Sequence, residues 1–404
     1  MQNHQTPRRL YLISWLTDFV LILLIFTVGR HLAESGMGTL ELGLIGGGFS
    51  FCGAVSSVLF GWLSDRIGRH RLIVCGCALM LGCSLIILTF HHRLGWLLPA
   101  YWLSSFGVCM IYSPLIAWLN QGRNVKQSHA VISQTLIRFC LAWNLGIICA
   151  QFFGGWLFEL GLTWPLMLAS LLAGVNLIVV TFLHRHPSSR ARANDLPKTE
   201  KTDIERLSGA FAKLSWIANV GHALCISMMF HLFPQLVVAL NVPANHHGMI
   251  LAIGRFVTIL VYFLMHHSRF WHYRFSTALG AQVVAMGGLV LLATTQSEIG
   301  LTLGVMGLSF LAGYNYFASI YYSSTGGGEE KRGLASGLHE ATLGAGFAIG
   351  SIGGGIFGWI GGIRAPYLLA IALLFALTTL QIVLYYRRVR PLQLPLRRRV
   401  NNSF

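Results

Sequence analysis

Few side chains of this chain can take up a proton or hold an ion from inside a long apolar segment. Ionisable residues are costly in lipid, so those that are kept there usually bind a substrate, carry a proton or pair with one another. The residues of this kind are Asp18, Arg138, His222, His231, Arg255, His339 and Glu340. They predict a site for binding and proton transfer.

Asp18 lies inside the first apolar segment, in the run Leu-Thr-Asp-Phe-Val. Removal from water favours the protonated form of a carboxyl group. We therefore expect Asp18 to carry a proton, and Glu340, His222 and His339 are further candidates for this role. The alternative is a helix-packing acid that pairs with a nearby arginine or hydroxyl.

Arg255 follows a glycine in another apolar segment and has no acidic residue near it in the sequence. The fixed fork of donors on a guanidinium suits an anionic substrate group, so we predict a substrate-binding role for Arg255. A structural partner such as Asp18 or a backbone carbonyl is the alternative. Arg138 either extends toward lipid headgroups or forms a gating ion pair with Glu340.

Uncharged polar residues in the apolar segments extend the predicted substrate cavity. Tyrosine, asparagine and glutamine can line an amphipathic pocket. The candidates are Tyr112, Gln151, Asn219 and Asn315. Helix packing and an interfacial aromatic belt are the alternatives for these positions.

Composition indicates which elements must position these residues. The chain has 404 residues, of which 54% are hydrophobic and 10% charged, with a mean hydropathy of +0.63, whereas soluble proteins carry about 25% charged residues. A membrane span needs roughly 20 apolar residues. We predict an all-α polytopic membrane protein with spans at 10–29, 41–63, 72–90, 94–119, 133–156, 163–184, 212–239, 247–267, 275–295, 298–323, 334–359 and 364–386.

Lysine and arginine cluster in alternate loops of this arrangement. The positive-inside rule then places both termini and the central loop in the cytoplasm. The predicted divisions are a first bundle at 1–184, a linker at 185–211, a second bundle at 212–390 and a basic tail at 391–404. The formal net charge of +16 lies in short loops and therefore indicates topology, not nucleic-acid binding.

No motif in the sequence indicates an enzyme or a cofactor. The eight cysteines lie in or beside apolar runs and form no paired CxxC set, which favours packing over metal binding or disulfides. Three His-His pairs lie at predicted loop edges, and nothing in the sequence brings them together. Nucleotide-binding and hydrolase motifs are also missing from the sequence. We therefore expect no metal, no cofactor and no catalytic residue.

The loop between the second and third spans is the most specific motif. It reads Gly-Trp-Leu-Ser-Asp-Arg-Ile-Gly-Arg-His-Arg and resembles the Major Facilitator Superfamily signature Gly-x-x-x-Asp-Arg/Lys-x-Gly-Arg/Lys-Arg/Lys. The matching residues are Gly61, Asp65, Arg66, Gly68 and Arg69, with a histidine at the last basic position. The resemblance implies two pseudo-symmetric six-helix bundles, alternating access and a gating role for these five residues. It also implies that Asp65 contacts the cytoplasmic end of span 11.

A glycine pattern supports an internal repeat. Gly146-x-x-x-Ala-Gln-x-x-Gly-Gly in span 5 and Gly346-x-x-x-Gly-Ser-x-x-Gly-Gly in span 11 are offset by 200 residues. Superfamily members build their two bundles from such repeats. The first copy also resembles an antiporter signature, although Gln151 replaces its proline.

The sequence therefore predicts a secondary transporter that moves a small solute by alternating access, coupled to protons, with a weak preference for efflux. One alternative is uptake or exchange of an organic anion, which is suggested by Arg138 and Arg255. A second alternative is a sensor or assembly protein that keeps the fold without transport. We expect a monomer in a bacterial inner membrane, with the small-molecule substrate and the lipid bilayer as its partners.

Overall fold

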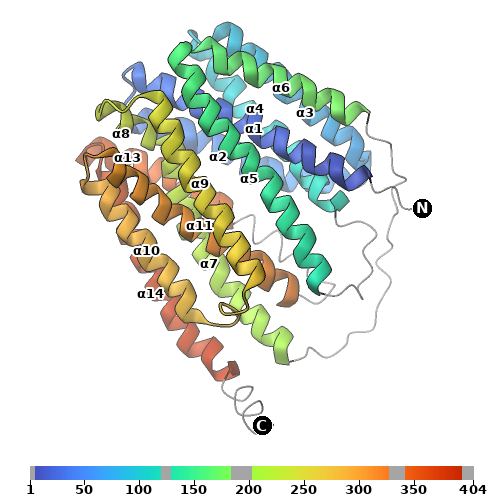
Figure 1. Cartoon of the computed structure of the whole chain (residues 1–404), viewed down its shortest axis with the longest axis vertical. Helices are drawn as coiled ribbons and strands as arrows, with labels where there is room; N and C mark the ends of the chain where they lie inside the picture. The colour runs from blue at the N-terminus through green and yellow to red at the C-terminus, as the bar shows by residue number, and fades with distance from the viewer. Residues whose placement is uncertain (1–4, 120–128, 183–202, 327–341, 394–404) are drawn as a thin grey trace.

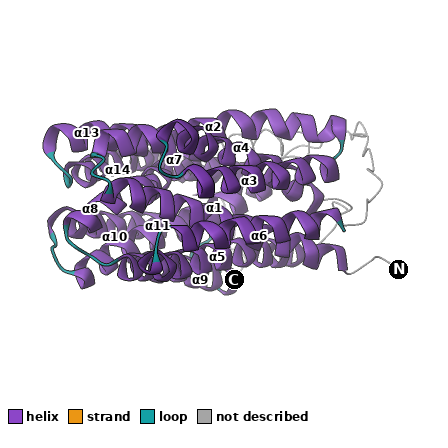
Figure 2. Cartoon of the chain, turned by 90° about the horizontal axis from the view of Figure 1, so that it is seen from above, coloured by secondary structure: helices purple, strands orange, loops and turns teal. Residues whose placement is uncertain are grey.

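The apolar segments form helices because a chain in lipid must satisfy its own backbone hydrogen bonds. The computed structural model describes residues 5–119, 129–182, 203–326 and 342–393, and every regular element within these ranges is a helix (Figures 1 and 2). The helices run side by side as two groups, which confirms the predicted all-α membrane fold.

The first group contains α1 (Gln5–Glu34), α2 (Thr39–Ile67), α3 (Arg69–Phe90), α4 (Leu94–Leu119), α5 (His129–Leu160) and α6 (Thr163–Thr181). The second contains α7 (Asp203–His231), α8 (Phe233–Ala239), α9 (Ala244–His267), α10 (Phe275–Thr294), α11 (Glu298–Gly326), the Thr342–Gly361 helix and α14 (Ala365–Leu384). The Thr342–Gly361 helix includes a π-helical turn, η2 (Ile349–Gly353), followed by α13 (Gly354–Gly361), and a second π-helical turn, η3 (Tyr385–Val389), follows α14.

Eleven helices of the described chain are long and apolar enough to cross a membrane. Helices α7 and α8 meet at a bend of 45° and make a twelfth span if they are counted together. Helix α7 begins at Asp203, ahead of the predicted span start at 212. The division into two bundles, a linker and a basic tail stays a prediction.

Glycines let equivalent helices of the two groups approach closely. Gly146 of α5 lies against the α1 backbone at Trp15, and Gly346 lies against the α7 backbone at Val220. A Cβ atom at either glycine would collide with the facing main chain. The 200-residue offset in the sequence therefore corresponds to the same packing in both groups, as two pseudo-symmetric bundles require.

The two groups meet at one end and diverge toward the other. The far end holds the ends of α1 and α5 and the beginnings of α2 and α9, while the opposite, terminal end carries the N-terminal end of α1 and the C-terminal end of α14 (Figure 1). Contacts between the groups run along α5 with α9 and along α2 with the Thr342–Gly361 helix. The molecule is thus joined at its far end.

Candidate functional site

A cavity of about 330 Å³ lies between the two groups of helices. Helices α1, α2, α4 and α5 line it from the first group, and α7, α9, α11 and the Thr342–Gly361 helix line it from the second. Most of its wall is apolar or aromatic. Its charged and titratable lining residues are Asp18, His222, His231 and Arg255, with tyrosine hydroxyl and cysteine thiol groups beside them.

Asp18 is held in place by hydroxyl groups of its own half. Its side chain is buried, and the Tyr112 hydroxyl of α4 donates a hydrogen bond to its carboxylate. The Tyr112 oxygen also lies 3.0 Å from the hydroxyl of Ser14, one turn before Asp18. The structure therefore places Tyr112 as a partner of Asp18 and not among the residues that line the cavity.

Arg255 faces Asp18 from the other half with few partners. Its side chain is 8% exposed, and the hydrogen bond that it makes in the described structure runs from Nη1 to Oδ1 of Asn144 at a long 3.4 Å. Its Cζ atom lies 5.9 Å from the centre of the Trp143 ring. Within the described residues Asp18 and Arg255 form no direct ion pair, although their charges attract one another across the cavity. Most of the five guanidinium donors are thus available to a ligand.

The other predicted substrate residues lie outside the cavity wall. Asn219 donates to the Ser319 hydroxyl at 2.9 Å, and Asn315 donates to the Ala218 carbonyl at 3.1 Å, both inside the second half. Gln151 is buried where α5 meets α9. His222 does line the cavity.

The structure describes only one partner of the predicted ion pair between Arg138 and Glu340. Arg138 lies on α5 with an exposed side chain. Glu340 and His339 lie outside the described residues. The gating pair and the proton-transfer role of these two residues stay predictions.

The loop that carries the family signature is a single-residue turn. Gly68 joins α2 to α3 at φ +92°, and its N–H bonds to the Ser64 carbonyl at 3.2 Å. Glycine enters this backbone region without steric penalty, which explains the motif position. Arg66 stacks on Trp62, with Cζ 3.7 Å from the ring centre.

The structure describes the surroundings of only some of the other residues of this motif. His70, which replaces a basic residue of the signature, bonds through Nε2 to the α6 carbonyl of Val180 at 3.0 Å. Arg69 begins α3. The surroundings of Gly61 and of the Asp65 side chain lie outside the described part, so the gating role of the loop stays a prediction.

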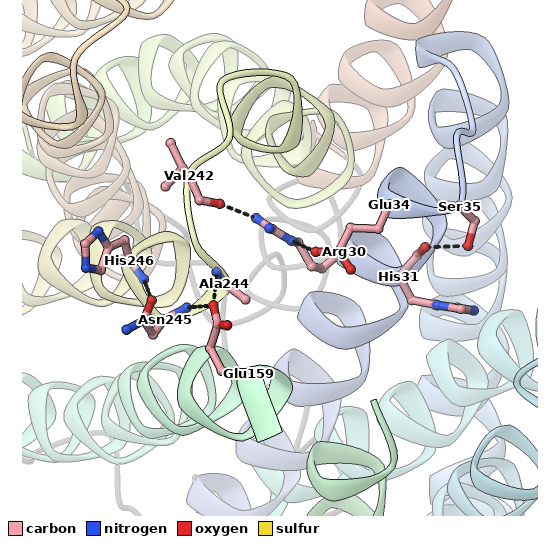
Figure 3. A network of polar contacts seen from close by, with 9 residues as sticks. All are labelled: Arg30, His31, Glu34, Ser35, Glu159, Val242, Ala244, Asn245 and His246. Carbon is pink, nitrogen blue, oxygen red and sulfur yellow. Dashed lines mark hydrogen bonds and ion pairs between the residues drawn. The ribbon is translucent and has the colours of Figure 1, made fainter. Parts of the chain in front are cut away.

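Polar groups close the far end of the molecule (Figure 3). Arg30 donates from Nε to Glu34 at 2.6 Å and from Nη1 to the Val242 carbonyl at 3.0 Å. Glu159 of α5 accepts hydrogen bonds from the backbone N–H groups of Ala244 and Asn245, at 2.5 and 3.3 Å. These bonds tie α1 and α5 to the start of α9. We call this set, together with the glycine contacts below, the far-end seal.

Two glycine contacts complete the far-end seal. Gly155 of α5 packs on the backbone of Ala244, and Gly355 of the Thr342–Gly361 helix packs on Gly43 of α2. The two glycines are the equivalent positions of the sequence repeat. Each half therefore inserts its repeat glycine against the other half.

Sequence reasoning missed three aromatic residues that line the cavity near Arg255. They are Trp143 of α5, Tyr262 of α9 and Tyr316 of α11. Tyr262 lies two turns after Arg255 on one helix face, a spacing visible in the sequence. The approach of Trp143 to these residues depends on how α5 packs against α9 and has no local signal. Among the described residues no cluster of ligands suits a metal ion.

Comparison with known proteins agrees with the fold. Residues 10–338 match the family model described as Major Facilitator Superfamily. A search of curated protein sequences gives no significant match.

Several solved transporter structures have a similar fold at low sequence identity. The chain is similar to the nucleoside transporter NupG (TM-score 0.65, 14% identity, covering 95% of this chain and 99% of that one). It is also similar to a bacterial homolog of the human lysosomal transporter Spinster, inward-facing and unoccupied (0.68, 14%, 94% and 96%). A third similar structure is the human organic anion transporter MFSD10 (0.63, 17%, 93% and 99%). At these identities the likeness shows the fold alone.

Proposed function

Because the chain belongs to the Major Facilitator Superfamily of secondary transporters, we propose that it moves a small organic anion together with a proton. The anion binds at Arg255 and the proton at Asp18, which both line the cavity between the halves, Asp18 from α1 and Arg255 from α9. This joins the proton coupling predicted from Asp18 with the anionic substrate predicted from Arg255.

The observation that carries the proposal is the buried guanidinium of Arg255 with its long hydrogen bond to Asn144. A buried charge is unfavourable unless it is paired and hydrogen-bonded. A substrate anion in the cavity would supply the missing acceptors. The Asp18 carboxylate already accepts a hydrogen bond from Tyr112, so it is less suited to hold a cationic substrate.

The placement of the two charges links anion binding to protonation. When Asp18 is ionised, its charge offsets that of Arg255. When Asp18 is protonated, the positive charge of Arg255 remains and attracts an anion more strongly. Protonation of His222 or His231, which also face the cavity, would act in the same direction. By linkage the bound anion favours proton uptake to the same extent, which is the behaviour of a cotransporter.

Orientation follows from the distribution of positive residues. With both termini in the cytoplasm, the far-end seal lies on the outer side, and the structure corresponds to an inward-facing state. Cotransport with protons in a bacterial inner membrane, where the proton gradient is directed inward, gives uptake. Efflux is the alternative direction. It is suggested by the likeness of the glycine segment of span 5 to an antiporter signature, and it is weakened there because Gln151 replaces the proline.

Flux measurements in proteoliposomes test the proposal. With an acidic exterior, labelled small organic anions should accumulate inside, and a protonophore should abolish the accumulation. Asp18→Asn mimics the protonated carboxyl, so its anion binding should depend less on pH than that of the unaltered protein, and it should lose coupled uptake. Movement of lipophilic cations instead of anions would overturn the proposal in favour of efflux. Binding without flux of either kind would support the sensor.

A further inference from the structure

The wall of the cavity around Arg255 is built from aromatic rings. Trp143 meets Tyr316 edge-to-face at a centroid distance of 5.6 Å, and Tyr316 lies 6.2 Å from Tyr262. The Arg255 guanidinium lies beside the Trp143 ring. A guanidinium and three rings therefore share one side of the cavity.

Space for a ligand lies next to these rings. Ala312 lines the cavity one helical turn before Tyr316, and its small side chain takes up little of the space there. Ligand pockets usually measure about 300–1,000 Å³, so a cavity of about 330 Å³ is at the small end of that range. It suits one ring with a short acidic chain better than a larger solute.

The charge of the cavity limits the kind of anion. Arg255 is the only lysine or arginine among the described residues that line it. A single guanidinium matches one carboxylate through two parallel hydrogen bonds. A phosphate dianion would bring a second negative charge into a largely apolar cavity that already holds the carboxyl group of Asp18.

We propose that the substrate is a small aromatic carboxylate, with its carboxylate on Arg255 and its ring against Trp143 and Tyr316. This deepens the proposed function and rests on it. Aromatic rings prefer edge-to-face or offset contacts with one another, and such pairs stabilise beyond the area they bury. Trp143 and Tyr316 belong to different halves, so a ring that packs against both of them also contacts the two halves that move relative to one another during transport.

A matched pair of substrates tests the ring. Benzoate and cyclohexanecarboxylate carry the same charge on a six-carbon ring, but only benzoate is aromatic. Proton-driven uptake by the unaltered protein should show a KM for benzoate that is roughly two- to tenfold lower. The preference should fall toward one in Trp143→Leu and Tyr316→Leu, and it should persist in Trp143→Phe and Tyr316→Phe.

Phe230→Leu is the matched control, because Phe230 lines the cavity from α7 and makes no ring contact with these three residues in the described structure. It should keep the preference for benzoate. Equal transport of both acids by the unaltered protein would overturn the aromatic inference while leaving the proposed function intact. Uptake of other organic anions but of neither acid would also overturn the inference, whereas failure to move any organic anion would overturn the proposed function itself.

Discussion

The far-end seal and the central cavity each contain one buried arginine, and the two arginines differ in their hydrogen bonds. Arg30 in the seal is 6% exposed and Arg255 in the cavity is 8% exposed. Arg30 donates short bonds to a carboxylate and to a carbonyl of the other half. Arg255 donates a bond of 3.4 Å to an amide oxygen.

Burial alone therefore does not distinguish a structural arginine from a binding one. The Arg30 charge is paired with the exposed carboxylate of Glu34, and its second bond is to the Val242 carbonyl. The Arg255 charge faces a cavity that the Asp18 carboxyl also lines, and the two side chains form no direct pair in the described structure. A buried cation that lacks close acceptors is stabilised when a ligand brings them.

The largest effect that we predict separates the two arginines. Arg255→Gln should weaken anion binding by roughly 10- to 100-fold, since hydrogen bonds to charged groups contribute about 1.5–3 kcal/mol. Arg30→Gln should leave the affinity within about threefold, because Arg30 does not line the cavity. Equilibrium binding of the same labelled anion to both purified variants measures the difference.

Arg255→Lys serves as the control for charge without the planar fork. We expect an intermediate affinity for this variant. Equal losses in Arg30→Gln and Arg255→Gln would remove the distinction between a structural and a binding arginine.

The second effect concerns the glycines of the far-end seal. A Cβ at Gly355 would lie 2.9 Å from the Gly43 Cα and the Thr39 carbonyl oxygen, so Gly355→Val should force the far end open. Overpacking costs about 1–3 kcal/mol, which shifts the conformational equilibrium by roughly 5- to 100-fold. Faster hydrogen–deuterium exchange at the start of α2 would report the opening.

Gly287 offers a matched control, because it lies in α10 and an added Cβ meets nothing within 4 Å. Gly287→Val should leave exchange at the far end unchanged. Slow exchange in Gly355→Val, as in the unaltered protein, would show that the glycine contact does not hold the seal closed.

The sequence was sufficient for the elements that follow from hydropathy and from local backbone geometry. The apolar segments predicted the spans, and the signature motif marked the loop in which Gly68 turns the chain at φ +92°. Asp18 and Arg255 stood out because ionisable residues are rare in such segments. Their presence in the wall of one cavity agrees with that reasoning.

Contacts between the halves could not be predicted in the same way. Arg30 lies one residue beyond the first predicted span, and its carbonyl partner at Val242 lies 212 residues away in the chain. Trp143 and Tyr316 are likewise brought together only by the packing of separate halves. Gln151 looked like a cavity residue, yet it lies where α5 meets α9.

One turn also departs from the local rule. The loop between α9 and α10 contains no glycine, and Tyr273 there takes φ +54°. Its hydroxyl pairs with Ser208 at 2.8 Å, and its carbonyl accepts from Gln393 at 2.7 Å. Tertiary hydrogen bonds hold a conformation that the sequence alone would assign to glycine.

The third effect tests the polar part of the far-end seal. Glu159 accepts from two backbone N–H groups at the start of α9, where the helix dipole favours negative charge. Glu159→Gln keeps the shape and loses the charge, so it should destabilise the far-end seal by about 0.5–1 kcal/mol. Hydrogen–deuterium exchange around residues 242–248 should rise by only a few-fold. A change as large as that of Gly355→Val would mean that charge and not close packing holds the far end.

The smallest predicted effect concerns His247. It tests whether a buried polar group without close partners matters for transport when it lies outside the cavity. The His247 side chain is fully buried one helical turn after the α9 residues of the far-end seal, and within the described structure neither ring nitrogen has a hydrogen-bond partner. The ring packs against Phe26 and Phe233, with centroid distances of 4.7 and 5.4 Å. It resembles Arg255 in lacking close hydrogen-bond partners but, unlike Arg255, it is absent from the cavity wall.

If an unpartnered polar group matters only where a ligand can reach it, His247→Phe should be harmless. Replacing a buried polar group by an apolar one of similar shape is nearly neutral or stabilising, so we expect the melting temperature in detergent to stay equal or rise slightly. Anion uptake should remain within about twofold of that of the unaltered protein. His247→Ala, which leaves a cavity between the two phenylalanines, should instead lower the melting temperature. Loss of uptake in a stable His247→Phe variant would show that the imidazole itself takes part in the transport cycle. An unpartnered polar group outside the cavity wall would then have a role in transport, as Arg255 is proposed to have.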